Sequence, residues 1–165
     1  MAEAEGAVIV LVEIPGGSRN KYEVDPGSGH IFLDRTLFTS TRYPADYGYI
    51  EGTLGGDGDP LDALVFVGEP TFSGCRIRSR PVGLFRMWDE KGADEKILCV
   101  PVQDPTWSHI RDVGDFPENL LAEIEHFFQV YKNLEDKPTG TEGFEDRAAA
   151  LRVIEDSRRR AGRAR

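Results

Sequence analysis

The densest group of potentially reactive side chains lies in residues 57–62 (DGDPLD), where Asp57, Asp59 and Asp62 place three carboxylates within six residues. Carboxylates crowded into a solvated turn repel one another and add no stability, so taken alone the run is either an ordinary polar turn or a cation site. The apolar run 61–67 (LDALVFV) follows directly, which predicts that Asp62 lies at or inside a buried strand. Because buried carboxylates need partners and hard cations supply them, the spacing favours a divalent metal site.

Other uses of such a run fit the residues less well. An EF-hand loop that began at Asp57 would need a ligand, a glycine and a glutamate at its fifth, sixth and twelfth positions, where Leu61, Asp62 and Gly68 stand. An aspartyl-phosphate nucleophile follows an apolar strand, whereas residues 54–56 (LGG) precede this run. The sequence contains no GxxxxGK[ST] phosphate loop and no evident serine or cysteine nucleophile partnered by histidine.

Several further polar residues are unremarkable singly and informative together. Asp89 and Asp94 flank a hairpin turn predicted over residues 89–94, and Lys96 shares a strand face with Asp94. The other candidates are acids, bases and tyrosines from the rest of the chain: Glu13, Lys21, Glu23, Arg35, Tyr43, Tyr47, Tyr131 and Lys132. Carboxylates that bind divalent metal, combined with basic and tyrosine groups that bind a polyanion, suit phosphoryl transfer to water.

The elements that must position these residues are mostly strands followed by helices. Apolar or alternating runs between turn residues predict strands over 7–14, 19–25, 30–34, 61–67, 76–88 and 96–102, and the aromatic loop 43–52 leads into another strand. Helical spacing predicts helices over 117–132, capped by Asp115 or a neighbour, and over about 145–160, with a polar loop at 138–143 between them. This order predicts one α+β, mainly β domain over residues 1–165: a small barrel or curled sheet with helices packed at one side, and a frayed basic tail at about 158–165.

Charge and hydropathy narrow the function classes. The formal net charge of -9, with 29 acidic against 20 basic residues, argues against broad binding of nucleic acid. No apolar run is long enough to span a bilayer, and no signal peptide is evident, so a cytoplasmic protein without a membrane partner is expected. Cys75 and Cys99 are predicted to be free thiols.

Several segments resemble the family I soluble inorganic pyrophosphatases, and the bacterial short-chain form most closely. The likeness extends from about residue 8 to the final helix, and DGDPLD resembles the family signature. The segments that carry it are residues 12–15 (VEIP), 20–23 (NKYE), 43–50 (YPADYGYI), 57–62 (DGDPLD), 80–83 (RPVG), 89–96 and 126–132.

The resemblance implies an enzyme that hydrolyses pyrophosphate to two orthophosphates by direct attack of a metal-activated water. It implies a five-stranded OB-like barrel with two flanking C-terminal helices, and several Mg2+ ions per active site, with Mn2+ or another divalent ion as an alternative. Asp59 would be the general base. The metal ligands would be Asp57, Asp62, Asp89, Asp94, Glu13 and Glu23, and pyrophosphate or phosphate would bind to Lys21, Arg35, Tyr131, Lys132, Tyr47, Tyr43 and Lys96.

The sequence also departs from the family pattern. Residues 138–140 (PTG) replace a frequent tryptophan and Phe144 replaces another aromatic residue, while Val130 and Asn133 stand where many bacterial members carry a histidine and an acid. The homohexamer usual in bacterial members is therefore an expectation. Three alternatives stay open: an OB-type nucleic-acid-binding module, which needs exposed aromatics and a positive groove; a metal-dependent phosphatase for organic phosphates; and an inactive relative, which the intact carboxylate set disfavours.

Overall fold

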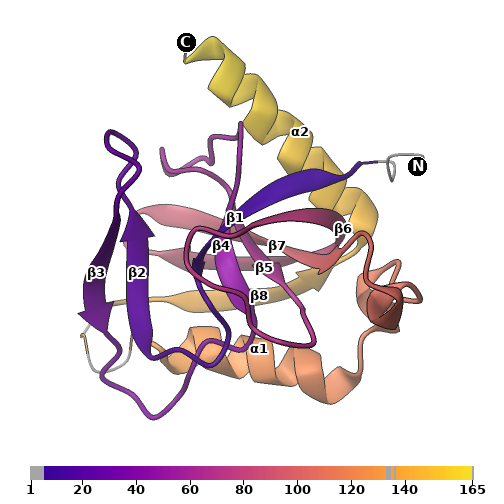
Figure 1. Ribbon diagram of the computed structural model, residues 1–165, viewed down its shortest axis with the longest axis horizontal. Helices are drawn as coiled ribbons and strands as arrows, with labels where there is room; N and C mark the ends of the chain where they lie inside the picture. The colour runs from indigo at the N-terminus through magenta and orange to yellow at the C-terminus, as the bar shows by residue number, and fades with distance from the viewer. Residues whose placement is uncertain (1–5, 133–134, 136, 165) are drawn as a thin grey trace.

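A closed ring of five strands forms the centre of the fold, in the order β1, β4, β5, β7, β6 and back to β1 (Figure 1). The computed structural model describes residues 6–132, 135 and 137–164. The ring strands are β1 (Val8–Ile14), β4 (Asp46–Ile50), β5 (Asp62–Val65), β6 (Arg76–Asp89) and β7 (Gly92–Pro101). Neighbouring strands are antiparallel, except for the parallel pair β5 and β7. The ring confirms the predicted five-stranded barrel, and β6 closes it because its 14 residues reach both β1 and β7.

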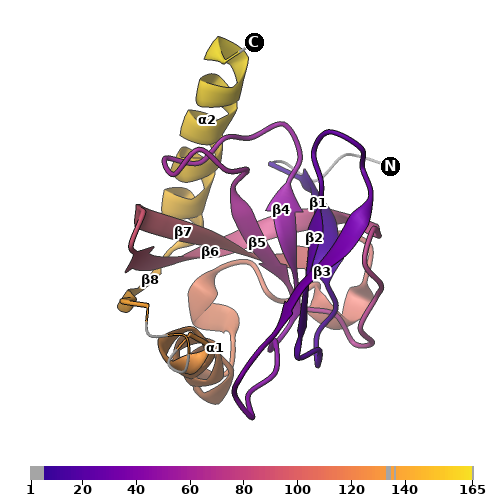
Figure 2. The ribbon, with the colours of Figure 1, turned by 90° about the vertical axis from the view of Figure 1, so that its left-hand side faces the viewer.

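The ring strands bury side chains on both faces, which explains why residues 61–67 form a continuous apolar run. Within β5, Leu64 belongs to one buried cluster, while Ala63 and Val65 belong to another. Helix α1 (Glu118–Val130) packs Ile124, Phe127 and Phe128 into the first cluster, and helix α2 (Arg147–Arg163) packs Ala149, Ala150 and Ile154 into the second. The two helices therefore cover different sides of the sheet, so the prediction that both pack at one side was wrong (Figures 1 and 2).

Two elements lie outside the ring. Strands β2 (Asn20–Val24) and β3 (Ile31–Thr36) form a separate antiparallel hairpin that stands beside β1 (Figure 2). Strand β8 (Gly140–Glu145) pairs with β6, where the sequence predicted a polar loop. The loop prediction failed because tertiary contacts decide this segment: Phe144 packs 4.9 Å from the ring of Phe85, and a side chain at Gly140 would lie 2.3 Å from the indole of Trp88.

The beginning of α1 and the end of α2 differ from the prediction. The N-cap of α1 is Pro117, with no side-chain hydrogen bond, and Asp115 instead ends the short 3-10 helix η2 (Val113–Asp115), where it accepts hydrogen bonds from backbone N–H groups. The predicted basic tail is helical, because α2 continues through Arg163. Cys75 and Cys99 are free. Among the helices that the structure describes, none is long and apolar enough to cross a membrane.

Candidate active site

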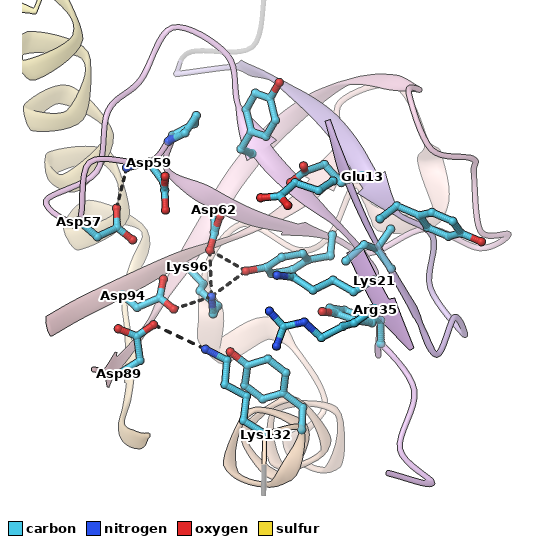
Figure 3. A pocket seen from close by; sticks show the side chains of 18 of the residues that line it. Glu13, Lys21, Arg35, Asp57, Asp59, Asp62, Asp89, Asp94, Lys96 and Lys132 are labelled. Carbon is cyan, nitrogen blue, oxygen red and sulfur yellow. Dashed lines mark hydrogen bonds and ion pairs between the residues drawn. The ribbon is translucent and has the colours of Figure 1, made fainter. Parts of the chain in front are cut away.

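A cavity of about 350 Å³ lies between the β2–β3 hairpin, the ends of the ring strands and the C-terminal end of α1 (Figure 3). Every predicted site residue lines it, although these residues come from positions 13 to 132 of the chain. They are Glu13, Lys21, Glu23, Arg35, Tyr43, Tyr47, Asp57, Asp59, Asp62, Asp89, Asp94, Lys96, Tyr131 and Lys132. The fold thus brings the predicted set together, while the role of each residue remains a prediction.

The acidic loop, residues 54–61 between β4 and β5, folds back on itself through its own main chain. The N–H of Gly55 donates to the carbonyl of Asp59 at 2.6 Å, and the N–H of Asp59 donates to Oδ1 of Asp57 at 3.1 Å. Gly58 adopts a φ of 90°, a left-handed conformation that glycine reaches without strain. Asp62 begins β5 directly after this loop, so the three carboxylates stand at one edge of the cavity (Figure 3).

Lys96 is a buried cation at the centre of the site. Its side chain is 1% exposed, and its Nζ donates to the Tyr47 hydroxyl at 2.7 Å, to Asp62 at 3.0 Å and to Asp94 at 3.2 Å (Figure 3). Burial alone would lower the pKa of Lys96, but the charges of Asp62 and Asp94 outweigh it and raise this pKa above its ordinary value. Register explains the arrangement, because Asp62 and Lys96 are paired residues of the parallel strands β5 and β7.

The hairpin between β6 and β7 is tighter than predicted. Asp89 pairs with Gly92 and Met87 pairs with Asp94, so Asp94 lies inside β7 and on the same face as Lys96, as the sequence indicated. Asp89 at the end of β6 lies 3.7 Å from the Nζ of Lys132, which follows helix α1. Asp94 therefore faces a lysine of its own strand, and Asp89 faces a lysine from the segment after α1.

The basic wall of the cavity comes from the β2–β3 hairpin. Lys21 and Arg35 are register partners, and Asp34 accepts hydrogen bonds from both, at 3.3 and 3.0 Å. Glu135 accepts a further hydrogen bond from Nη1 of Arg35 at 2.7 Å. Burial would raise the pKa of Asp34, but Arg35 and Lys21 more than offset it and lower this pKa.

Sequence reasoning missed several charged residues in and beside the cavity. Asp34 is adjacent to a predicted site residue, but a partner for two cations becomes visible only once strands β2 and β3 are paired. Glu135 lies three residues beyond Lys132, and this spacing was its only signal. The other charged residues of the lining that were not predicted are Glu90, Lys91 and Lys137.

The site tyrosines are buried and remain neutral hydrogen-bond donors. Tyr47 donates its hydroxyl to Oδ2 of Asp62 at 2.6 Å, and its ring lies 5.4 Å from that of Tyr43. Burial raises the pKa of Tyr43, Tyr47 and Tyr131 well above the usual value for a phenol. At neutral pH these hydroxyls can therefore bind carboxylate or phosphate oxygens without adding negative charge.

Carboxylates outnumber basic groups in the cavity, and two of them have raised pKa values, chiefly because they are buried. Burial, with smaller contributions from Asp62 and Glu23, raises the pKa of Glu13 to about 7, although the N–H of Val24 opposes the shift. Burial and the neighbouring Asp94 likewise raise the pKa of Asp57.

The donor set suits a hard divalent cation. It consists of carboxylate oxygens, which Mg2+ prefers to nitrogen or sulfur ligands. Within the described residues, no three His, Cys, Asp or Glu side chains already converge into a complete metal centre. Because Mg2+ keeps several waters and needs only one or two direct carboxylates, this spacing remains compatible with its coordination.

Comparison with known proteins gives consistent matches over most of the chain. The family model described as "Inorganic pyrophosphatase" matches residues 10–162. An inorganic pyrophosphatase of Streptomyces coelicolor is 63% identical over 126 residues, which cover 76% of this chain and 77% of the relative. One of Leifsonia xyli subsp. xyli is 54% identical over 147 residues, which cover 88% and 90% of the two chains.

Solved structures match equally well. The inorganic pyrophosphatase of Helicobacter pylori superposes with a TM-score of 0.94 at 38% identity, covering 98% of this chain and 96% of the other. That of Thermus thermophilus superposes with a TM-score of 0.94 at 44% identity, covering 98% and 95%.

The raised pKa of Glu13 predicts a pH-dependent effect of Glu13→Gln in metal-free protein. Between the unfolded pKa of 4.5 and the folded pKa of about 7, the folded state binds the proton more tightly, so this residue lowers stability as pH rises through that window. Glu13→Gln should raise the free energy of unfolding by about 2 kcal/mol at pH 8 and leave it nearly unchanged at pH 4. Urea unfolding in excess chelator measures both values.

The matched control is Glu123→Gln, whose side chain is exposed on α1. It should change stability by less than about 0.5 kcal/mol at either pH. An equal gain for Glu13→Gln at pH 4 and pH 8 would contradict the assignment of a buried, destabilising carboxylate.

Proposed function

The chain belongs to the inorganic pyrophosphatase family, and on that premise we propose how this cavity hydrolyses pyrophosphate to two orthophosphates. The observation that carries the proposal is the arrangement of opposite charges around one cavity. Carboxylates from β1, the acidic loop, β6 and β7 face basic groups from the β2–β3 hairpin and from the segment after α1 (Figure 3). Such a cavity can hold a polyanion on one side and its counter-cations on the other.

Pyrophosphate would bind to the basic and tyrosine groups. Lys21 and Arg35 on the hairpin and Lys132 after α1 supply positive charge, and Tyr131 supplies a neutral hydroxyl. The guanidinium of Arg35 can donate two parallel hydrogen bonds to phosphate oxygens. In the structure, Lys132 lies near Asp89. A phosphate oxygen that took over as the partner of Lys132 would leave Asp89 available for metal binding.

Magnesium is the proposed cofactor, held by Asp57, Asp62, Asp89, Asp94, Glu13 and Glu23, with Mn2+ or another hard divalent ion as a substitute. When bound, such ions would neutralise phosphate charge and lower the pKa of a coordinated water. The carboxylate surplus and the raised pKa values of Glu13 and Asp57 support this. A divalent cation would neutralise the excess negative charge and would favour the ionised form of both carboxyl groups.

Asp59 is the proposed general base. Its side chain is 65% exposed, and its carboxylate lies 3.7 Å from Lys91 in an exposed ion pair, whereas Asp62 and Asp94 both accept hydrogen bonds from the buried Lys96. A carboxylate that is held only by a weak, exposed ion pair can take a proton from the attacking water and release it to solvent. Lys96 and Tyr47 would hold Asp62 in place while the phosphates separate.

The alternatives considered from the sequence gain no support. The relatives and solved structures that match are inorganic pyrophosphatases rather than nucleic-acid-binding modules. The charged residues and tyrosines that line the cavity also differ from the apolar pocket that would bind a nucleoside.

Two further expectations remain proposals. We propose a homo-oligomer, for which the hexamer is the expected form, and the exposed apolar side chains of Phe32, Leu33, Phe38 and Phe72 support association. Asn133, one of the departures at the expected interface, lies outside the described residues. Sedimentation velocity that showed only monomer would reject the oligomer. The cytoplasmic location remains a prediction.

The proposed reaction is tested by phosphate release from pyrophosphate with Mg2+ and with excess chelator. Rapid release that stops with chelator is expected, because the carboxylates cannot bind the polyanion without cations. Release from ATP and from a phosphate monoester should be much slower, since most of the side chains that line the cavity are charged and suit phosphate and cations rather than an organic group. Equal rates with and without chelator, in metal-depleted protein, would reject the metal-dependent mechanism.

Asp59→Asn should cut turnover by roughly two to four orders of magnitude, the usual contribution of a general base. Its exposed carboxylate makes little contribution to packing, so the free energy of unfolding should change by less than about 0.5 kcal/mol. Steady-state rates at saturating Mg2+, together with urea unfolding, check both expectations.

Asp62→Asn supplies the contrast, because it should raise the Mg2+ concentration needed for the half-maximal rate. Near wild-type turnover in Asp59→Asn would remove Asp59 from the role of base. An unchanged magnesium titration in Asp62→Asn would do the same for its role as ligand.

A further inference from the structure

The acidic loop contains three glycines, at positions 55, 56 and 58, and yet it must hold Asp57 and Asp59 in defined positions. Glycine gives a backbone more freedom than any other residue, so such a loop needs restraint from outside. At its base, the Thr53 hydroxyl donates to the carbonyl of Ile50 at 2.6 Å and accepts from the N–H of Leu61 at 3.0 Å. This pair closes the neck of the loop but does not hold the residues between Thr53 and Leu61.

Helix α2 holds the loop by both main-chain groups of a single residue, Leu54. The N–H of Leu54 donates to the carbonyl of Ser157 at 3.0 Å, and Nη1 of Arg160 donates to the carbonyl of Leu54 at 2.7 Å. Ser157 and Arg160 are three residues apart and share one face of the helix. Figures 1 and 2 both show the loop between β4 and β5 lying against the C-terminal half of α2.

The contact leads directly to the carboxylates. Leu54 precedes Gly55, whose N–H donates to the carbonyl of Asp59 at 2.6 Å, and the N–H of Asp59 in turn donates to Asp57. A shift of Leu54 therefore passes through one short hydrogen bond to Asp59. The carboxylates of Asp57, Asp59 and Asp62 repel one another, and a charge-assisted hydrogen bond from a helix can hold the loop against this repulsion.

The geometry points to Arg160 as a positioning residue for the reaction: it fixes the acidic loop by binding the main chain of Leu54. This inference rests on the proposed function, in which Asp57 is a metal ligand and Asp59 is the general base, so that their positions affect the reaction. It separates Arg160 from the other arginines at the end of α2, because Arg158, Arg159 and Arg163 are exposed. Arg159 forms ion pairs with Glu155 and Asp156 on its own helix.

Arg160→Met tests the inference, with Arg159→Met as the matched control on the same helix. In metal-free protein, hydrogen exchange at the amides of Leu54 and Gly55 should become about tenfold faster in Arg160→Met, because a charged hydrogen bond that restrains them is lost. The control should exchange at the wild-type rate. Ser157→Ala should also match wild type, because the clamp uses the main-chain carbonyl, and the Ser157 hydroxyl has no hydrogen-bond partner among the residues that the structure describes.

The second measurement is the rate of phosphate release from pyrophosphate as a function of Mg2+ and of pyrophosphate. Arg160→Met should lower kcat or raise the Mg2+ concentration for the half-maximal rate by about tenfold, because misplaced groups lose their alignment. KM for pyrophosphate should change by less than about twofold, since Lys21, Arg35 and Lys132 lie on other elements. Arg160→Lys, which keeps a cationic donor, should recover part of the loss.

Each outcome decides the question. If Arg160→Met matches Arg159→Met in both measurements, the inference is wrong. If exchange quickens while kcat and the magnesium requirement stay unchanged, the contact is structural only and the positioning role is rejected. Should Arg160→Met not fold, Arg160→Gln takes its place in the same comparison. A wild-type protein without pyrophosphatase activity would reject the proposed function instead, and hydrogen exchange would still report whether Arg160 restrains the loop.

Discussion

The structure around the cavity depends on one buried ammonium group. Lys96 is nearly inaccessible to solvent and joins three strands of the ring, through Tyr47 on β4, Asp62 on β5 and Asp94 on its own strand β7. A buried charge is tolerated only when it is paired and hydrogen-bonded, so the strands must keep the register that supplies these partners. The same register places two carboxylates at the edge of the cavity, which ties the chemistry of the site to the closure of the barrel.

Three other cations that line the cavity each have a carboxylate partner from another element. Arg35 lies between Asp34 and Glu135, Lys132 lies near Asp89, and Lys91 lies near Asp59. These pairs compensate part of the negative charge of the cavity, while burial, with a smaller contribution from neighbouring carboxylates, still raises the pKa of Glu13 and of Asp57. A cavity that is incompletely neutralised by its own lysines and arginines is suited to exchange some of these pairs for divalent cations and a polyanion.

The two helices serve the site from different sides. Helix α1 packs Phe127 and Phe128 against the site tyrosines and ends where Tyr131 and Lys132 enter the cavity. Helix α2 packs on the other cluster and reaches the acidic loop through Leu54. The site is therefore supported both by the aromatic core beneath its tyrosines and by the helix that ends the described chain.

The sequence by itself determined the local chemistry and most of the elements. Three patterns depend only on neighbours in the chain. The alternation of Lys21 with Glu23 predicted a strand, and the helical spacing near Phe127 predicted a helix, as the structure shows. The acidic run predicted a group of carboxylates, which line the cavity. Only the tertiary structure decided which distant residues meet. It made β8 a strand by pairing it with β6, set Glu135 against Arg35, and turned the predicted basic tail into a helix that binds Leu54. These outcomes depend on hydrogen bonds and packing between segments up to 106 residues apart, and local propensity carries no information about such partners.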